Sequence, residues 1–328
     1  MKKKISIWFA IILLLFLSVI LALAFGAAEV TYKEAWHAVT MTKTSETITM
    51  LQELRIPRVV GAIAVGAALA LSGAMMQGVT RNPLADPGLL GVTAGAYAAL
   101  ALTMAFLPSA NYFVISIACF IGAAVGTILV VMVSSLAPNG FSPIRIVLAG
   151  AAISAFLYAI SDGISITFQL AKDVSMWTAG GLIGVNWSQL QIALPIILIC
   201  TVLALFLSNQ LSILRMSEEV AIGLGQNVLL IKFAMYTLIT ILAGTAVALV
   251  GNLAFVGLMI PHIARKIIGS DYKKILPMSV LIGGIFMVLA DLVGRTINAP
   301  FETPVSAIVA VLGLPFFLLI VHKGVKGS

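Results

Sequence analysis

The residues of this chain that could do chemistry are few and widely separated, and three arginines stand out among them. Arg55 and Arg58 lie three residues apart, and Pro57 between them favours the start of a helix. If that first turn is helical, both guanidinium groups project from one surface, where they either pair with carboxylates of a partner or anchor the helix at the membrane interface. Arg295 follows Asp291 by four residues, the spacing that brings opposite charges together on a helix. This spacing predicts an ion pair.

A second polar segment lies between two apolar stretches, at residues 217–226. Ser217 is typical of a helix N-cap, the two glutamates after it suit the first turn of a helix, and the glycines beyond would end it. The pattern predicts a short amphipathic helix that either binds a soluble partner or lies on the membrane surface. Two glutamates facing anionic lipid disfavour the second alternative. The candidate residues are Ser217, Glu218, Glu219, Ile222, Gly223, Leu224, Gly225 and Gln226.

No motif points to catalysis or to a resident cofactor. The sequence has no G-x-x-x-x-G-K-[ST] phosphate loop and no H-E-x-x-H motif, and its three histidines are far apart. We therefore expect no metal, no cofactor and no enzymatic activity. Asp162 and Asp291 lie within apolar segments, where an ion-coupled secondary transporter would need ionisable groups. Asp162 either lines a wet vestibule or hydrogen-bonds to a neighbouring helix, and the sequence does not separate these alternatives.

The composition sets the class of protein that must position these residues. Of 328 residues, 61% are apolar and 9% are charged, whereas ordinary soluble domains are about 25% charged. This excludes a soluble enzyme, a disordered chain and a secreted disulfide scaffold, and it disfavours a β-barrel. The net charge of +7 is spread in ones and twos between apolar runs, which disfavours nucleic-acid binding. We predict an all-α polytopic protein of the cytoplasmic (inner) membrane.

Because a span needs ~20 apolar residues, the chain has room for about ten transmembrane helices in a single domain, residues 1–328. Glycines at helix-face spacings, such as Gly122 and Gly126, predict close helix packing. Thirteen of the nineteen Lys and Arg residues fall on the side of the amino terminus, which predicts that both termini are cytoplasmic. The predicted spans are residues 5–25, 59–79, 88–106, 112–136, 143–168, 189–209, 228–250, 252–270, 275–296 and 303–321.

Several longer motifs are similar to those of the iron-siderophore/cobalamin permeases, the membrane subunits of type II ABC importers. The similar segments are Arg55-Ile-Pro-Arg58 and residues 73–78, 81–91, 251–265, 291–295, 300–304 and 313–317. They extend from about residue 50 to residue 322, so the resemblance covers nearly the whole chain. It implies the ten-helix, BtuC-like fold.

The resemblance also implies a function and a set of partners. The chain would be the permease of an importer for ferric siderophores, with cobalamin and haem as alternative cargoes. A second permease subunit, identical or paralogous, would complete the path. Two cytoplasmic ATP-binding subunits would hydrolyse ATP, and an extracytoplasmic substrate-binding protein would deliver the cargo. The reading from residues alone leaves an ion-coupled secondary transporter as the alternative.

Site residues follow from the same resemblance. Arg55, Arg58 and Arg295 resemble arginines that receive acidic residues of the binding protein, which favours docking over interfacial anchoring. The segment 217–226 resembles the coupling helices seated in a cleft of the ATPase. Three further positions resemble those that close a cytoplasmic gate: Asn82, Leu84 and Ser142.

Overall fold

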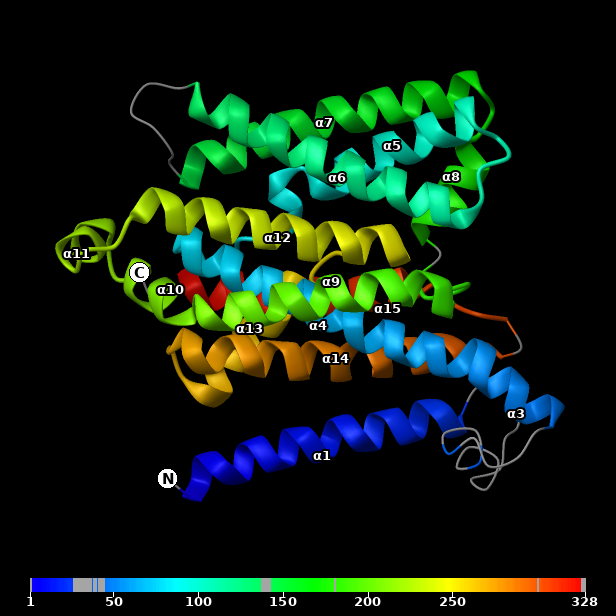
Figure 1. The fold of residues 1–328 in the computed structure, drawn as a ribbon, viewed down its shortest axis with the longest axis horizontal. Helices are drawn as coiled ribbons and strands as arrows, with labels where there is room; N and C mark the ends of the chain where they lie inside the picture. The colour runs from blue at the N-terminus through cyan, green and yellow to red at the C-terminus, as the bar shows by residue number, and fades with distance from the viewer. Residues whose placement is uncertain are drawn as a thin grey trace.

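The computed structural model describes residues 2–25, 37, 40, 45–136, 143–179, 181–299 and 301–325, and every regular element among them is a helix (Figure 1). The amino-terminal half contains α1 (Lys2–Ala24), α3 (Glu46–Met50), the π-helical turn η1 (Leu51–Arg55), α4 (Ile56–Thr80), the 3-10 turn η2 (Pro87–Leu90), α5 (Val92–Phe106), α6 (Tyr112–Ser135) and α7 (Pro143–Thr167). The other half contains α8 (Ala171–Ala179), α9 (Trp187–Phe206), α10 (Ser208–Leu214), α11 (Glu218–Gly223), α12 (Val228–Val250), α13 (Val256–Ile268), α14 (Tyr272–Thr296) and α15 (Val305–Val325).

Each of the ten predicted apolar segments coincides with one helix, which confirms the all-α fold with about ten apolar helices. Within the described residues, seven helices are long and apolar enough to cross a membrane by themselves, and α5 and α15 carry shorter apolar stretches. The tenth, α13, has 13 residues, about 20 Å at 1.5 Å per residue, and non-helical chain at residues 251–255 precedes it. Irregular backbone at membrane depth is tolerated where it is buried or lines a cavity.

Helix α4 forms the centre of the bundle, with 89% of its most apolar window buried. It packs against α12, α13 and α14, while α5, α6 and α7 form a neighbouring group that α12 joins to the centre (Figure 1). Helix α1 lies at the opposite edge, against α14. The sequence of α4 suits this place because it is rich in Gly and Ala, which let several helices approach one backbone.

The predicted close packing at glycines is confirmed. A Cβ added at Gly122 would overlap the backbone of Gly95, and one at Gly126 would overlap the backbone of Gly91. Gly66 of α4 faces Gly283 of α14 in the same way. These contacts hold α6 against α5, and α4 against α14, at separations that only glycine permits.

The bundle has two distinct ends (Figure 1). Helix α1 begins and α15 ends at the end where α11 lies, which we name the α11 end. Helices α3 and α8 lie at the opposite end, which we name the α8 end.

Candidate functional site

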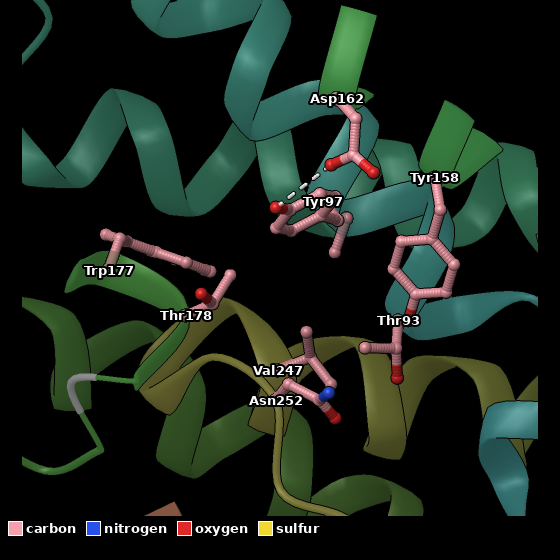
Figure 2. Close-up of a pocket in the computed structure, with 9 residues that line it drawn as sticks. Thr93, Tyr97, Tyr158, Asp162, Trp177, Thr178, Val247 and Asn252 are labelled. Carbon is pink, nitrogen blue, oxygen red and sulfur yellow. Dashed lines mark hydrogen bonds between the residues drawn. The ribbon is translucent and has the colours of Figure 1, made fainter. Parts of the chain in front are cut away.

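A cavity of about 290 Å³ near the α8 end contains Asp162 of α7 (Figure 2). The Tyr97 hydroxyl of α5 donates to the Asp162 carboxylate at 3.5 Å, so this side chain lines a cavity and also contacts a neighbouring helix. No described Lys, Arg or His side chain forms an ion pair with Asp162. The remaining walls carry two more aromatic rings and three polar groups: Tyr158, Trp177, Thr93, Thr178 and Asn252.

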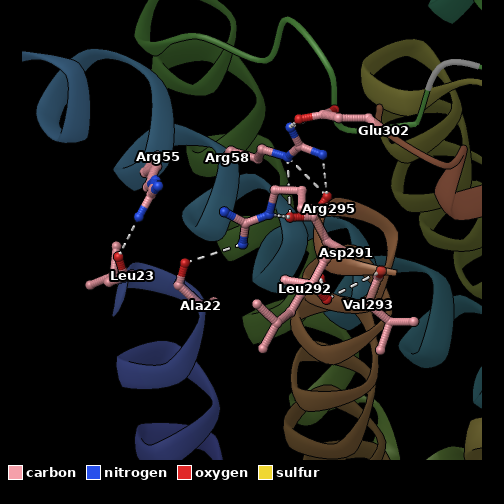
Figure 3. A network of polar contacts seen from close by, with 10 residues as sticks. Ala22, Leu23, Arg55, Arg58, Asp291, Leu292, Val293, Arg295 and Glu302 are labelled. Carbon is pink, nitrogen blue, oxygen red and sulfur yellow. Dashed lines mark hydrogen bonds and ion pairs between the residues drawn. The ribbon is translucent and has the colours of Figure 1, made fainter. Parts of the chain in front are cut away.

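Arg58 and Arg295 form one network with two carboxylates at the α8 end, and Arg55 lies nearby, bonded to α1 (Figure 3). Asp291 lies 2.9 Å from Arg58 Nη2 and 3.0 Å from Arg295 Nε, and it is 1% exposed. Glu302 accepts from Arg58 Nη1 at 2.8 Å. The predicted ion pair between Asp291 and Arg295 is therefore confirmed, and Arg58 extends it from α14 to α4.

Arg55 is less accessible than its spacing predicted, and Arg295 is buried beside it. Arg55 Nη1 donates to the carbonyl of Leu23 at 3.0 Å, and Arg295 Nη2 donates to the carbonyl of Ala22 at 3.2 Å. The expectation that Arg55 projects freely from the surface is wrong, since Arg55 is 7% exposed, and Arg295 is 3% exposed. The physical reason is that carbonyls in the last turn of a helix lack helical partners and carry partial negative charge, which attracts guanidinium groups.

The helix that carries Arg55 and Arg58 begins earlier than Pro57 suggested. Ser45 caps it, with its side chain accepting from the backbone N–H of Ile48 at 3.2 Å. Proline has no N–H to donate, and in the turn before it the N–H of Ile56 donates to Leu51, the π-helical pattern of η1. The extra residue in this turn changes the angular offset between the two arginines, so that Arg55 faces α1 while Arg58 faces α14.

The predicted short helix at residues 217–226 is confirmed as α11. The Ser217 side chain accepts from the N–H of Val220 at 3.0 Å, and Gly225 follows the helix in the left-handed conformation (φ 79°). The segment also exposes apolar side chains: Ile222 is 63% exposed and Leu224 is 64% exposed. An exposed apolar surface on a short helix at the end of a bundle is typical of a protein contact.

One carboxylate ties α11 to two long helices. Glu218 accepts from Lys232 Nζ of α12 at 2.7 Å and from Arg81 Nη2, at the end of α4, at 3.1 Å. Lys232 is 8% exposed, and the sequence reading did not single it out. A lysine inside an apolar span was the available signal, because such groups are rare without a partner.

The candidate gate residues Asn82 and Leu84 lie in the turn between α4 and η2. Asn82 Oδ1 accepts from the Leu84 N–H at 2.9 Å, and Asp86 Oδ1 accepts from the Gly88 N–H at 2.8 Å. Burial raises the pKa of Asp86, and the hydrogen bond from Gly88 opposes that rise. Two such side-chain turns fix the backbone of the segment. Ser142, the third gate candidate, lies outside the described residues.

Gln77 is a buried polar residue in the segment 73–78, and the sequence analysis assigned it no role. Its Nε2 donates to the carbonyl of Leu258 at 3.1 Å, and its Oε1 accepts from Arg265 Nη2 at 2.9 Å. The side chain, 2% exposed, therefore links α4 to α13 near the α11 end. A polar amide in an apolar helix is itself the signal, because it must find partners on another helix.

These regions consist of arginine–carboxylate pairs, hydrogen-bonded turns and an exposed apolar helix. In the part of the chain that the structure describes, no group of three or more His, Cys, Asp or Glu side chains could hold a metal ion. Arginine–carboxylate networks recognise charge, and an exposed apolar helix recognises a protein surface.

Comparisons with known proteins agree over nearly the full length. The FecCD transport family matches residues 13–323. The iron(3+)-hydroxamate import system permease protein FhuB of Bacillus subtilis (strain 168) is 39% identical over 317 residues, which cover 96% of this chain and 82% of FhuB. The ferric enterobactin transport system permease protein FepD of Escherichia coli (strain K12) is 36% identical over 319 residues, covering 97% and 95% of the two chains.

A solved structure of a putative metal-chelate type ABC transporter, in an inward-facing conformation, has the same fold. It superimposes with a TM-score of 0.85 at 27% sequence identity and covers 97% of this chain and 99% of its own. The chain therefore belongs to the FecCD transport family.

Proposed function

We propose that the chain is the membrane permease of an ABC importer that carries ferric siderophores. The observation that carries this proposal is the match, over nearly the whole chain, to permeases named for ferric hydroxamate and ferric enterobactin. The competing secondary transporter loses support because Asp291, one of its two candidate carboxylates, is buried between Arg58 and Arg295. A carboxylate held by two arginines is a poor carrier of protons or cations.

The α11 end faces the cytoplasm in this proposal, and α11 seats in a cleft of an ATP-binding subunit. The excess of Lys and Arg on this side supports the orientation. The residues assigned to the contact are those of the segment 217–226, with Ile222 and Leu224 as its apolar anchors. Two ATP-binding subunits serve two permease subunits.

A second permease subunit faces α7. This helix exposes Asp162 together with the small residues Ala151, Ala155 and Ala159, spaced four apart. A carboxylate suits lipid poorly, whereas small residues suit the close approach of another helix and a smooth path for cargo. The second subunit, identical or paralogous, closes the path on this side.

The binding protein docks at the α8 end, where Arg55, Arg58 and Arg295 lie. Arg58 makes the first contact, because its side chain is 12% exposed and its partner Glu302 is 29% exposed at the rim. An acidic residue of the binding protein takes the place of Glu302 on the guanidinium group. Arg55 and Arg295 lie deeper, where their charges make the electrostatic potential around Arg58 more positive. Their hydrogen bonds to carbonyls of α1 hold this end of α4 and α14 against α1.

Coupling runs from α11 to the gate through Glu218. Closure of the ATP-binding subunits moves α11, and the bonds from Glu218 to Lys232 and Arg81 carry that motion into α12 and α4. Asn82 and Leu84 follow Arg81 directly and, with Ser142, form the cytoplasmic gate. The nucleotide shifts the equilibrium between inward and outward access because it binds the two states differently.

Reconstitution tests the proposal. We expect liposomes containing the permease, its ATP-binding subunits and its binding protein to take up a radiolabelled ferric hydroxamate only when ATP is supplied. The permease alone, with a proton or sodium gradient, should take up none. Gradient-driven uptake by the permease alone would replace the ABC importer with a secondary transporter.

A further inference from the structure

The carboxylate of Asp162 is exposed to a cavity, and no Lys, Arg or His side chain among the described residues forms an ion pair with it. Its one hydrogen bond in the described structure, from the Tyr97 hydroxyl, is 3.5 Å long, which is at the weak limit for such a bond. This differs from Asp291, which two arginines hold. Acidic groups within membrane helices are costly unless they pair or face water, so an unpaired carboxylate in a cavity marks a site for a positively charged group.

The walls around this carboxylate carry the features that bind cations. Tyr97 and Tyr158 meet edge to face, with ring centroids 5.5 Å apart, on the same side of the cavity as Asp162 (Figure 2). Trp177 of α8 lies on the opposite side. Aromatic faces attract ammonium groups, and the attraction strengthens where water is excluded. Thr178 and Asn252 add hydrogen-bonding groups to the wall nearest Trp177.

The cavity is built in advance of any ligand. The Ser161 hydroxyl donates to the carbonyl of Tyr97 at 3.2 Å, which fixes α7 against α5. Across the cavity, Gly251 adopts φ 74°, and a Cβ there would lie 3.0 Å from the carbonyl oxygen of Trp177. The non-helical segment that carries Asn252 therefore packs directly against α8. Walls fixed in this way bind a ligand without a further ordering cost.

We propose that this cavity is a subsite for a cationic arm of the cargo, such as the primary ammonium group of a ferric chelate. Its volume, about 290 Å³, lies just below the ~300–1,000 Å³ of sites that hold whole small molecules, which suits an arm of a larger chelate. Through this subsite the permease itself favours amine-bearing chelates over otherwise identical neutral ones. The inference rests on the proposed function, because it names a chemical class within the iron chelates.

The test compares two cargoes that differ by one charge. A ferric trihydroxamate with a free primary amine and the same chelate with that amine acetylated are offered to the reconstituted importer, and the ratio of their uptake rates is measured. We expect Asp162→Asn to lower this ratio by about tenfold, because the ammonium group loses its carboxylate partner. Uptake of the acetylated chelate is measured in the same samples as the reference for each variant, and Asp162→Glu should keep the preference.

The matched control is Asp173→Asn, which removes an exposed carboxylate from α8 at the same end of the bundle. Because the binding protein is the same in every sample, its own preference cancels between variants. An unchanged ratio in Asp162→Asn, or an equal fall in Asp173→Asn, would overturn the subsite.

A second measurement separates this proposal from the proposed function. The full-length permease in nanodiscs, without its partners, is titrated with the amine-bearing chelate by calorimetry. We expect about tenfold weaker binding to Asp162→Asn than to the unsubstituted chain. If no chelate is transported by any sample, the proposed function fails while this titration still decides the subsite; equal binding to both chains would refute it.

Discussion

The two ends of the bundle offer a partner different kinds of surface. At the α8 end, Asp291 and Arg295 are 1% and 3% exposed and pair with each other inside the protein. At the α11 end, α11 turns Ile222 and Leu224 outward, at 63% and 64% exposed. Where charged residues are already paired inside the protein, little free charge remains at the surface, and a partner that binds there dissociates readily. Exposed apolar side chains favour a protein contact that stays buried. The difference matches a transient partner at one end and a permanent one at the other.

The largest effect should come from breaking the interior network at the α8 end. Asp291→Asn leaves Arg58 and the buried Arg295 without their shared carboxylate, and removing one partner of a buried ion pair costs about 3–5 kcal/mol. We expect a large fall in the thermal unfolding midpoint of the purified permease, followed by tryptophan fluorescence. The control is Glu302→Gln at the exposed rim, which should cost at most ~1 kcal/mol. Equal midpoints for the two variants would mean that burial does not set the strength of this network.

The next effect tests whether the α11 end needs a partner. A Cβ at Gly223 meets nothing within 4 Å in this chain, so Gly223→Leu should leave the unfolding midpoint unchanged. Against an ATP-binding subunit, the same side chain would obstruct a central contact, and such contacts are worth about 2 kcal/mol or more. We expect ATP-driven uptake to fall by about thirtyfold.

Gly225 provides a separate test that requires a backbone control. Its φ of 79° makes any substitution strained, so a defect in Gly225→Ala would mix strain with lost contact. Gly269 has a φ of 94° and equally open surroundings, so Gly269→Ala measures the strain alone. Normal uptake in Gly223→Leu would contradict the role of α11, whatever the result at Gly225.

The same two regions show which features a sequence reveals. The cap at Ser217, the glycine after α11 and the ion pair of Asp291 with Arg295 are local, because their partners lie within a few residues and fixed helical spacing brings them together. The apolar helices were predictable for the same reason, since each depends on its own composition.

Long-range partners left no such pattern. Glu302 lies 244 residues from Arg58, and Ala22 lies 273 residues from Arg295, so nothing in the spacing indicated these two contacts. The cavity at Asp162 depends on several helices at once. A single polar residue in an apolar run, as at Gln77 and Lys232, indicates that the residue has a partner. The sequence does not indicate which residue that partner is.

The smallest effect concerns Glu302, and it decides how a satisfied network can still receive a partner. If an acidic residue of the binding protein takes the place of Glu302 on Arg58, then Glu302→Gln removes a competitor and should strengthen docking by about threefold, mainly through faster association at low salt. Surface plasmon resonance at two salt concentrations measures this. Glu53→Gln, an exposed glutamate at the same end, controls for the general change in potential. Weaker docking in Glu302→Gln would show instead that Glu302 positions Arg58 for its partner, because losing a positioning residue and losing a competitor change affinity in opposite directions.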